Sequence, residues 1–171
     1  MIDGKGDPNA GEFADAIGVL YNLSFNIKFT VKKESAIDYP VMALEALWGT
    51  ASGTFDPSDR TSWTWTAMIM QPEFVDSMLY RSAVEQVRKK KELKSLEKAR
   101  LEAFNEGHSA QIMHIGPYSA EAPTIMKLHE YIRESGGEPR GRHHEIYLGD
   151  PRRAAPSKLR TILRQPFDKS A

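Results

Sequence analysis

The amino-acid sequence predicts an α+β protein, in which two strand-helix-strand-strand repeats form one antiparallel sheet with helices on one face and a groove on the other. Three observations support this prediction. Some short segments alternate apolar and polar residues as strands do, others repeat apolar residues at helical spacing, and both halves of the chain show these segments in the same order. The paired motifs are Met1–Gly4 with Met113–Gly116, Glu45 with Glu145, and Ile69–Pro72 with Leu163–Pro166.

Repeat one, residues 1–72, is expected to contain a first strand at Met1–Gly4, a long helix and two further strands. Asp7 and Pro8 are typical of a helix start, and apolar residues then recur at helical spacing into the high twenties. Residues 22–31 are ambiguous, because their apolar side chains also alternate as in a strand, and we take them as helix. The other expected elements are a polar linker at 32–38, a strand at 39–48, a loop at 49–62 and a strand at 63–70.

A connecting helix at 73–100 and repeat two at 101–171 complete the single predicted domain, 1–171. The helix opens at Gln71–Glu73 and ends in a strongly basic segment, 88–100, which is more typical of a solvated helix end than of a nucleic-acid contact. The expected elements of repeat two are a strand at 110–115, a turn at 116–119 with Ser119 as a helix cap, a helix ended by Gly136 and Gly137, a strand around Glu145 and a last strand at 159–163.

Composition excludes several classes of function. The 171 residues hold 23 basic and 23 acidic side chains, so no net charge favours nucleic acid or a membrane surface. Cysteine is absent, which excludes disulfides, a thiol nucleophile and cysteine zinc sites and fits a reducing cytoplasm. No apolar run is long enough for a membrane span, and the first residues lack the features of a signal peptide. We therefore expect a cytoplasmic protein with no membrane association, no direct DNA binding and no cofactor.

The strand around Glu145 carries the most reactive combination of side chains. Because successive side chains of a strand point to opposite faces, Glu145 and Tyr147 share one face with His143, while His144 points to the other. The repeat pairs Glu45 with Glu145, so we expect two carboxylates on either side of one groove.

Several short motifs occur in a specific order along both halves of the chain. In this order they resemble the GyrI-like small-molecule-binding family, and more closely its stand-alone branch, the cyclopropanoid cyclopropyl hydrolases. The family also includes drug-sensing domains of transcription activators and a gyrase inhibitor, and the resemblance implies the same tandem fold as the repeat. The motifs are Gly4 to Pro8, Leu44 to Trp48 and Met68 to Pro72 in the first half, and His114-Ile115-Gly116-Pro117-Tyr118, His144-Glu145-Ile146-Tyr147-Leu148, Asp150-Pro151-Arg152-Arg153 and Leu159 to Pro166 in the second.

Two departures from that branch are visible. Relatives usually carry further residues before the first strand, so this strand is expected to be short. The branch also tends to have Leu-Glu-Gly-Leu-Trp-Trp where this chain has Leu44 to Gly49, and by alternation Gly49 shares a face with Glu45. We therefore expect one aromatic wall of the pocket to be missing, which bears on the substrate more than on the fold.

Glu145, Tyr118 and Tyr147 are the expected catalytic residues. Apolar and aromatic neighbours along its strand should raise the pKa of Glu145 and favour proton transfer near neutral pH. The alternative is a purely electrostatic carboxylate that attracts cationic ligands, and the residues alone leave both open. Either tyrosine could donate a hydrogen bond to a developing oxyanion, although each is also typical of an interface.

The expected ligand-binding residues are one glutamate and one histidine beside the groove, a second histidine before the turn, and three tryptophans. The tryptophans could form flat walls for an aromatic ligand, or one or two of them could belong to the core. His143 and Glu145 are compatible with metal ligation, but no third ligand converges on them, so we expect no metal. The full set is Glu45, Trp48, Trp63, Trp65, His114 and His143.

The resemblance implies a hydrolase that opens the cyclopropane ring of cyclopropanoid genotoxic natural products by adding water, which detoxifies them. Glu145 would position or deprotonate the water, and a tyrosine or Glu45 would stabilise charge on the conjugated oxygen. The alternatives are a non-catalytic protein that binds or sequesters drugs and a protein-interaction module of the gyrase-inhibitor type. The expected partner is a hydrophobic aromatic or cationic small molecule, and the protein is expected to be a monomer or a homodimer.

Overall fold

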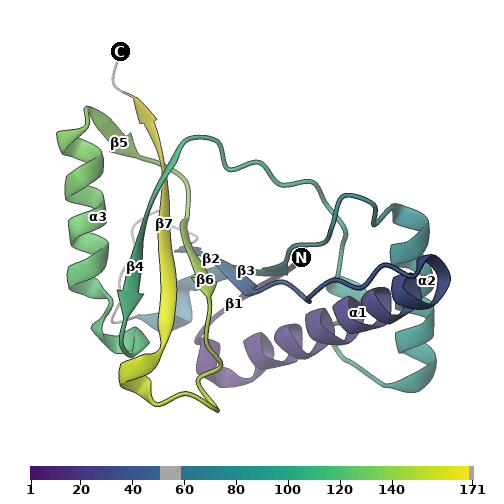
Figure 1. Cartoon of the computed structure of the whole chain (residues 1–171). Coiled ribbons are helices and arrows are strands. Elements are labelled where there is room, and N and C mark those ends of the chain that lie inside the picture. The colour runs from purple at the N-terminus through teal and green to yellow at the C-terminus, as the bar shows by residue number, and fades with distance from the viewer. Residues whose placement is uncertain (51–58, 170–171) are drawn as a thin grey trace. The chain divides into compact units, whose positions relative to one another are not determined.

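The computed structural model describes residues 1–50 and 59–169, and within them the chain forms three α-helices and seven strands (Figure 1). The helices are α1 (Glu12–Ser35), α2 (Ser77–Lys90) and α3 (Ala122–Glu134), and the strands are β1 (Ile2–Lys5), β2 (Leu44–Thr50), β3 (Trp63–Ile69), β4 (Ser109–Ile115), β5 (Gly137–Pro139), β6 (His143–Tyr147) and β7 (Arg160–Lys169). β1 pairs with β3, and β7 pairs with β4, β5 and β6, in each case antiparallel. The predicted α+β class is therefore confirmed. None of the described helices is both long and apolar enough to cross a membrane.

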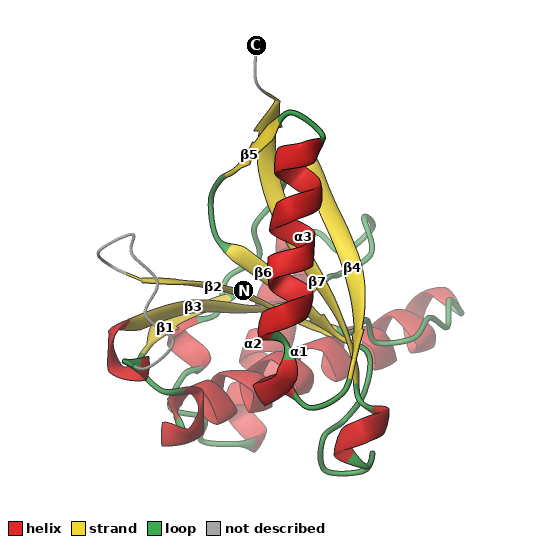
Figure 2. Ribbon diagram, turned by 90° about the vertical axis from the view of Figure 1, so that its left-hand side faces the viewer, coloured by secondary structure: helices red, strands yellow, loops and turns green. Residues whose placement is uncertain are grey.

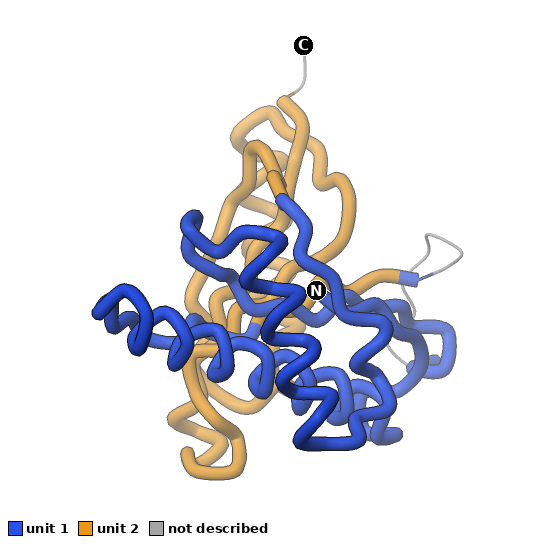
Figure 3. The backbone as a smooth tube through the Cα atoms, turned by 90° about the vertical axis from the view of Figure 1, so that its right-hand side faces the viewer, with its two compact units in different colours: residues 1–44, 50–103 blue, residues 45–49, 104–171 orange. Residues whose placement is uncertain are grey.

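The chain divides into two compact units, which Figure 3 colours separately. Unit 1 contains residues 1–44 and 50–103, and unit 2 contains residues 45–49 and 104–171. Unit 2 therefore includes the central part of β2, which comes from the first half of the sequence.

Unit 1 packs α1 against the pair of strands β1 and β3. The ring of Phe13 on α1 meets the ring of Trp65 on β3 edge to face, with 5.0 Å between centroids, and both side chains are buried. Gly4 on β1 leaves room for this indole, because a Cβ at that position would lie 2.1 Å from Trp65 Cζ2. Trp65 is thus a core residue of unit 1.

Unit 2 contains the strand order β2-β6-β7-β4, and β5 pairs with the far end of β7. Helix α3 packs on β4, β5 and β7 (Figure 2). Its core is formed by Leu128 and Ile132 of the helix with Ala110 of β4 and Leu163 of β7. Leu163 lies opposite Glu145 in the β6–β7 ladder, so the two side chains project from the same face of the strands, the one that α3 covers.

Helix α1 runs to Ser35, so the helical interpretation of residues 22–31 is confirmed and the predicted linker 32–38 begins too early. The alternation of aromatic residues in this segment has no structural meaning, because Phe25 and Phe29 are exposed. The buried side chains recur instead at helical spacing, at Leu20, Leu23, Ile27 and Val31.

Other boundaries of the first half also differ from the predictions. Strand β2 begins at Leu44, five residues later than Tyr39, where the sequence prediction placed its start. Most of the loop predicted at 49–62 lies at 51–58, outside the described residues.

In the second half, the connecting helix is shorter than the predicted 73–100. α2 begins at Ser77, where the Asp76 carboxylate accepts hydrogen bonds from two backbone N–H groups, and ends at Lys90. Ser119 does not cap α3, because Glu121 occupies the position before the helix. The last strand extends well beyond the predicted 159–163, and its extension pairs with β5, which the sequence did not predict.

Candidate functional site

Glu145, Tyr147 and Trp48 form the centre of the candidate site, all within unit 2. Burial alternates along β6, with His144 and Ile146 buried and Glu145 and Tyr147 half-buried on the other face. The Nε1–H of Trp48, on β2, donates a hydrogen bond of 3.0 Å to Tyr147 Oη. Because this oxygen accepts from the indole, the hydroxyl proton of Tyr147 remains for its hydrogen bond with the Glu145 carboxylate.

Burial sets the protonation of these groups. It raises the pKa of Glu145 to about 7, although the neighbouring Tyr147 hydroxyl, the indole N–H of Trp48 and the nearby His144 act in the opposite direction. Burial and the adjacent Glu145 carboxylate raise the pKa of Tyr147 well above its usual value. Glu145 is therefore poised to exchange a proton near neutral pH, whereas Tyr147 keeps its proton.

Tyr118 reaches this cluster from the loop before α3. Its ring meets the ring of Tyr147 edge to face, with 5.7 Å between centroids, and its side chain is 39 % exposed. Burial, together with nearby carboxylates, raises the pKa of Tyr118 to about 12. His114 is buried beneath the loop, with ring nitrogens 3.0 Å from Thr124 Oγ1 and 3.3 Å from the Pro117 carbonyl oxygen. His114 thus orients the loop that carries Tyr118.

Glu121 belongs to the same cluster and was not singled out in the sequence. It is only 5 % exposed, although it lies at the N-terminal end of α3. Burial and repulsion from Glu145 raise the pKa of Glu121 to about 8, against the opposing effect of the Thr161 hydroxyl. Nothing around Glu121 in the sequence marks it as buried, because Glu145 and Thr161 come from distant strands.

His143 lies beside Glu145 without pairing with it. Its Nε2 is 3.7 Å from Glu145 Oε1, which is too long for a hydrogen bond, and neither ring nitrogen has a hydrogen-bond partner among the described residues. Burial, with the nearby His129 and His144, lowers the pKa of His143 to about 4, so the ring is neutral at pH 7. The described part of the chain contains no group of three or more His, Cys, Asp or Glu side chains arranged to hold a metal ion.

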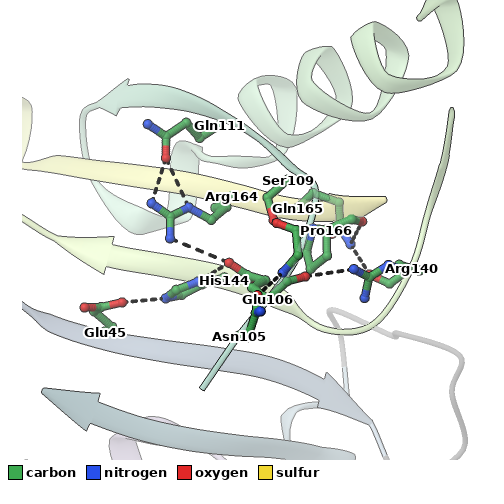
Figure 4. Close-up of polar contacts among 11 residues, drawn as sticks. Glu45, Asn105, Glu106, Ser109, Gln111, Arg140, His144, Arg164, Gln165 and Pro166 are labelled. Atoms are coloured by element: carbon green, nitrogen blue, oxygen red, sulfur yellow. Dashed lines mark hydrogen bonds and ion pairs between the residues drawn. The ribbon is translucent and has the colours of Figure 1, made fainter. Parts of the chain in front are cut away.

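Glu45, on β2, contacts the other face of β6, where it forms a network with His144 (Figure 4). His144 Nε2 is 2.9 Å from Glu45 Oε2, and its Nδ1 is 3.1 Å from both carboxylate oxygens of Glu106. Burial alone would lower the pKa of His144, but the hydrogen bonds to Glu106 and Glu45 outweigh it and raise this pKa. Arg164 extends the network, with Nη1 3.6 Å from Glu106 Oε2.

The prediction that Glu45 and Glu145 flank one groove is therefore wrong. Glu45 contacts His144, whose side chain leaves β6 on the side opposite Glu145. By alternation along β2, Gly49 shares the face of Glu45, and Trp48 shares the face of Glu145. The glycine consequently does not remove an aromatic wall beside Glu145.

The two remaining tryptophans belong to unit 1. Trp65 is 1 % exposed and packs on Phe13 in the core. Trp63 is half-buried at the start of β3, with the Arg60 guanidinium 5.7 Å from the centroid of its ring. Of the predicted site residues, unit 2 thus brings together Glu145, Tyr147, Tyr118, His143 and Trp48 on one face, with His114 behind the Tyr118 loop.

Comparison with known proteins identifies relatives over almost the whole chain. An uncharacterized conserved protein from Listeria innocua is 38 % identical, with a TM-score of 0.91, and the match covers 98 % of this chain and 85 % of that one. Two hydrolase structures from Listeria innocua are 36 % and 34 % identical, with TM-scores of 0.86 and 0.84 and the same coverage of 98 % and 85 %. No functionally curated protein matches the chain.

The family model that matches describes a GyrI-like small molecule binding domain, and it aligns with residues 2–166. The aligned region includes most of both units and each of the residues of the Glu145 cluster. The chain therefore belongs to the GyrI-like family of small-molecule-binding domains.

Proposed function

We propose that this chain is a hydrolase that opens the cyclopropane ring of a flat, aromatic natural product by adding water, with Glu145 as the general base. One observation carries the proposal: the half-buried Glu145 carboxyl lies beside Trp48 and Tyr147, and its pKa is raised to about 7. A carboxylate with such a pKa is a far stronger base than an exposed one, and near neutral pH a large fraction of the molecules carries it ionised. Two relatives described as hydrolases support a reaction in which water is a substrate.

In the proposed reaction, ionised Glu145 accepts a proton from water as the water oxygen attacks a carbon of the strained ring. The ring bond breaks, and its electron pair moves through the conjugated system to a carbonyl oxygen. The Tyr147 hydroxyl, itself held by the N–H of Trp48, orients the Glu145 carboxylate. Opening the ring removes the electrophile, so the reaction would detoxify an alkylating compound.

The contacts of the two tyrosines favour Tyr118 over Tyr147 as the donor to the developing oxyanion. The Tyr147 hydroxyl is engaged on both sides, since it accepts from Trp48 and bonds to Glu145. The hydroxyl of Tyr118 has no hydrogen-bond partner among the described residues, and its ring packs against that of Tyr147. Tyr118 is thus free to donate to a substrate oxygen, while Tyr147 acts as a positioning residue for Glu145.

The experiment is incubation of the protein with a cyclopropane-bearing conjugated alkylator, followed by mass spectrometry for the gain of one water. Glu145→Gln keeps the size of the side chain but cannot accept a proton, so we expect turnover to fall by at least about 100-fold. Binding of the ring-opened product, measured by calorimetry, should change little.

The matched control is Glu138→Gln, because Glu138 is exposed on β5 in the same unit. This variant should turn over the alkylator at the rate of the unmodified protein. Normal turnover by Glu145→Gln would contradict the assignment of the base.

A second candidate is a non-catalytic binder of aromatic cations. The observation that favours it is the same carboxylate, flanked by the indole of Trp48 and the rings of Tyr147 and Tyr118, a combination that attracts organic cations. This candidate predicts saturable binding of tetraphenylphosphonium without any product from the alkylator, and a loss of that binding in Glu145→Gln. Turnover of the alkylator by the unmodified protein would exclude it.

A further inference from the structure

We propose that Glu121 is a second catalytic residue, the general acid that gives a proton to the substrate oxygen on which negative charge develops. The inference rests on the proposed function of Glu145 and extends it from one carboxyl group to a pair.

The Glu121 carboxyl is buried and carries an oxygen without a hydrogen-bond partner among the described residues. Glu121 is 5 % exposed, and this oxygen is its Oε1. Thr161, fully buried beside it, also has an Oγ1 without a well-formed hydrogen bond there. Buried polar atoms without partners are rare in folded proteins and call for a ligand or water. Both oxygens therefore keep hydrogen-bonding capacity that the described residues do not satisfy with good geometry.

A continuous set of side-chain contacts joins Glu121 to Glu145. Tyr147 is two residues from Glu145 on β6 and lies directly opposite Thr161 on β7 in the ladder. The Thr161 hydroxyl in turn acts on the Glu121 carboxyl, and the Tyr118 ring, three residues before Glu121, packs on Tyr147. The two carboxyl groups thus border the same aromatic cluster and are close enough to repel each other.

A purely structural role does not account for Glu121. A capping residue would accept hydrogen bonds from the first backbone N–H groups of α3, and Glu121 makes no such bond. A structural buried carboxylate would be paired with a cation, as Glu106 is with His144 and Arg164. No lysine or arginine pairs with Glu121 among the residues described.

The environment assigns different protonation states to the two groups near neutral pH. Burial raises the pKa of both carboxyl groups, and because the two repel each other, the pair holds one proton near neutral pH. Glu145, which the Tyr147 hydroxyl faces, is the ionised base, and Glu121, whose Oε1 has no partner among the described residues, is the protonated acid.

Four other titratable groups lie close to the pair. Tyr118 and Tyr147 have raised pKa values and stay protonated and neutral near neutral pH. His143, 3.7 Å from Glu145, has a lowered pKa and is also neutral, whereas His144 on the opposite face lowers the pKa of Glu145.

With both carboxyl groups, the protons and electrons of the reaction balance. As the water oxygen bonds to the ring carbon, Glu145 takes the proton of water and the ring bond breaks. The electron pair reaches the conjugated oxygen, which takes the proton of Glu121. The product is the neutral adduct of substrate and one water, and exchange with solvent returns the proton from Glu145 to Glu121. Tyr118 does not replace Glu121, because its pKa of about 12 allows a hydrogen bond but not ready proton transfer.

The test compares Glu121→Gln, Glu121→Asp and the control Glu130→Gln, which alters an exposed glutamate on the same helix. With the cyclopropane-bearing alkylator, Glu121→Gln should lose at least about 100-fold in kcat at pH 7.5 and should lose the alkaline limb of its pH–rate profile. Glu121→Asp should keep that limb at a reduced rate, since it still carries a transferable proton. Glu130→Gln should match the unmodified protein.

A measurement without substrate tests the same claim. Carboxyl-carbon NMR of the free protein should show Glu121 titrating above pH 7, and at lower pH in Glu145→Gln because the repulsion is removed. An ordinary glutamate pKa for Glu121 overturns the inference. Turnover lost in Glu145→Gln but kept in Glu121→Gln overturns this inference alone, whereas absence of turnover in the unmodified protein overturns the proposed function.

Discussion

On one face of β6, the imidazole of His144 lies between the carboxylates of Glu45 and Glu106, and Arg164 stands behind Glu106. On the other face, Glu145 and His143 project from the same strand, 3.7 Å apart, and His143 is neutral. Both faces bury acidic and imidazole groups. Only the first gives them opposite charges at hydrogen-bond distance.

This difference distinguishes side chains that stabilise the fold from side chains that are suited to catalysis. Paired buried charges are costly to break, because removal of one partner leaves the other uncompensated. Unpaired buried groups shift their pKa instead, and groups with shifted pKa values suit proton transfer. The His144 face is therefore expected to govern stability, and the Glu145 face is expected to govern chemistry.

The largest effect on stability is expected from His144→Leu. It leaves the Glu45 and Glu106 carboxylates buried and facing each other, at a cost of about 3–5 kcal/mol in the free energy of unfolding. Urea denaturation at pH 6 measures it. The pKa of His144 is higher in the folded chain than its ordinary value of 6.5 in the unfolded chain. The contribution of His144 to the free energy of unfolding is therefore fully present below pH 6.5, and it is lost as the pH rises through the pKa of the folded state.

The control for this variant is His108→Leu, because His108 is exposed in the same unit. It should change the free energy of unfolding by less than about 0.5 kcal/mol. Equal stability of His144→Leu and His108→Leu would show that the paired face does not govern stability.

A smaller, pH-dependent effect is expected from His143→Leu. The pKa of His143 is lowered from 6.5 to about 4, so the unfolded chain binds a proton that the folded one does not, and the protein loses stability as the pH falls through this window. The variant should lose less, by on the order of 2 kcal/mol between pH 7 and pH 4. Urea denaturation at both pH values measures the difference. An unchanged pH dependence would mean that His143 is solvated or paired.

The smallest effect is expected from Trp48→Phe, which removes the hydrogen bond to Tyr147 Oη and keeps a ring in place. We expect a loss of about 1 kcal/mol in the free energy of unfolding. Because the indole also lowers the pKa of Glu145, the acid limb of the pH–rate profile should move to higher pH. A profile identical to that of the unmodified protein would show that Trp48 does not act on the base.

Local patterns in the sequence were sufficient to predict much of this architecture. Alternation around Glu145 gives the correct faces for Glu145, Tyr147 and His144, since a strand has a period of two whatever surrounds it. The helical interpretation of residues 22–31 holds because burial against the rest of unit 1 follows the helical period, although Phe25 and Phe29 suggest a strand.

The site depended on contacts that no local pattern records. The repeat predicts that Glu45 is the counterpart of Glu145, but repetition in sequence does not fix which face of a neighbouring strand a side chain occupies, and Glu45 joins His144 instead. Glu121 is surrounded in the sequence by small residues, and its burial comes from β6 and β7, far along the chain. Its place beside Glu145 follows from tertiary structure alone.

The membership of Glu45–Gly49 in unit 2 has a consequence for how this protein can be recombined. A chimera that joins the first half of one relative to the second half of another, at a crossover near residue 100, would separate the codons for Trp48 and Tyr147. The indole and the phenol that meet through one hydrogen bond would then come from different parents. Shuffled libraries should therefore keep the β2 segment and the second half from a single donor, so that the site is inherited as one block.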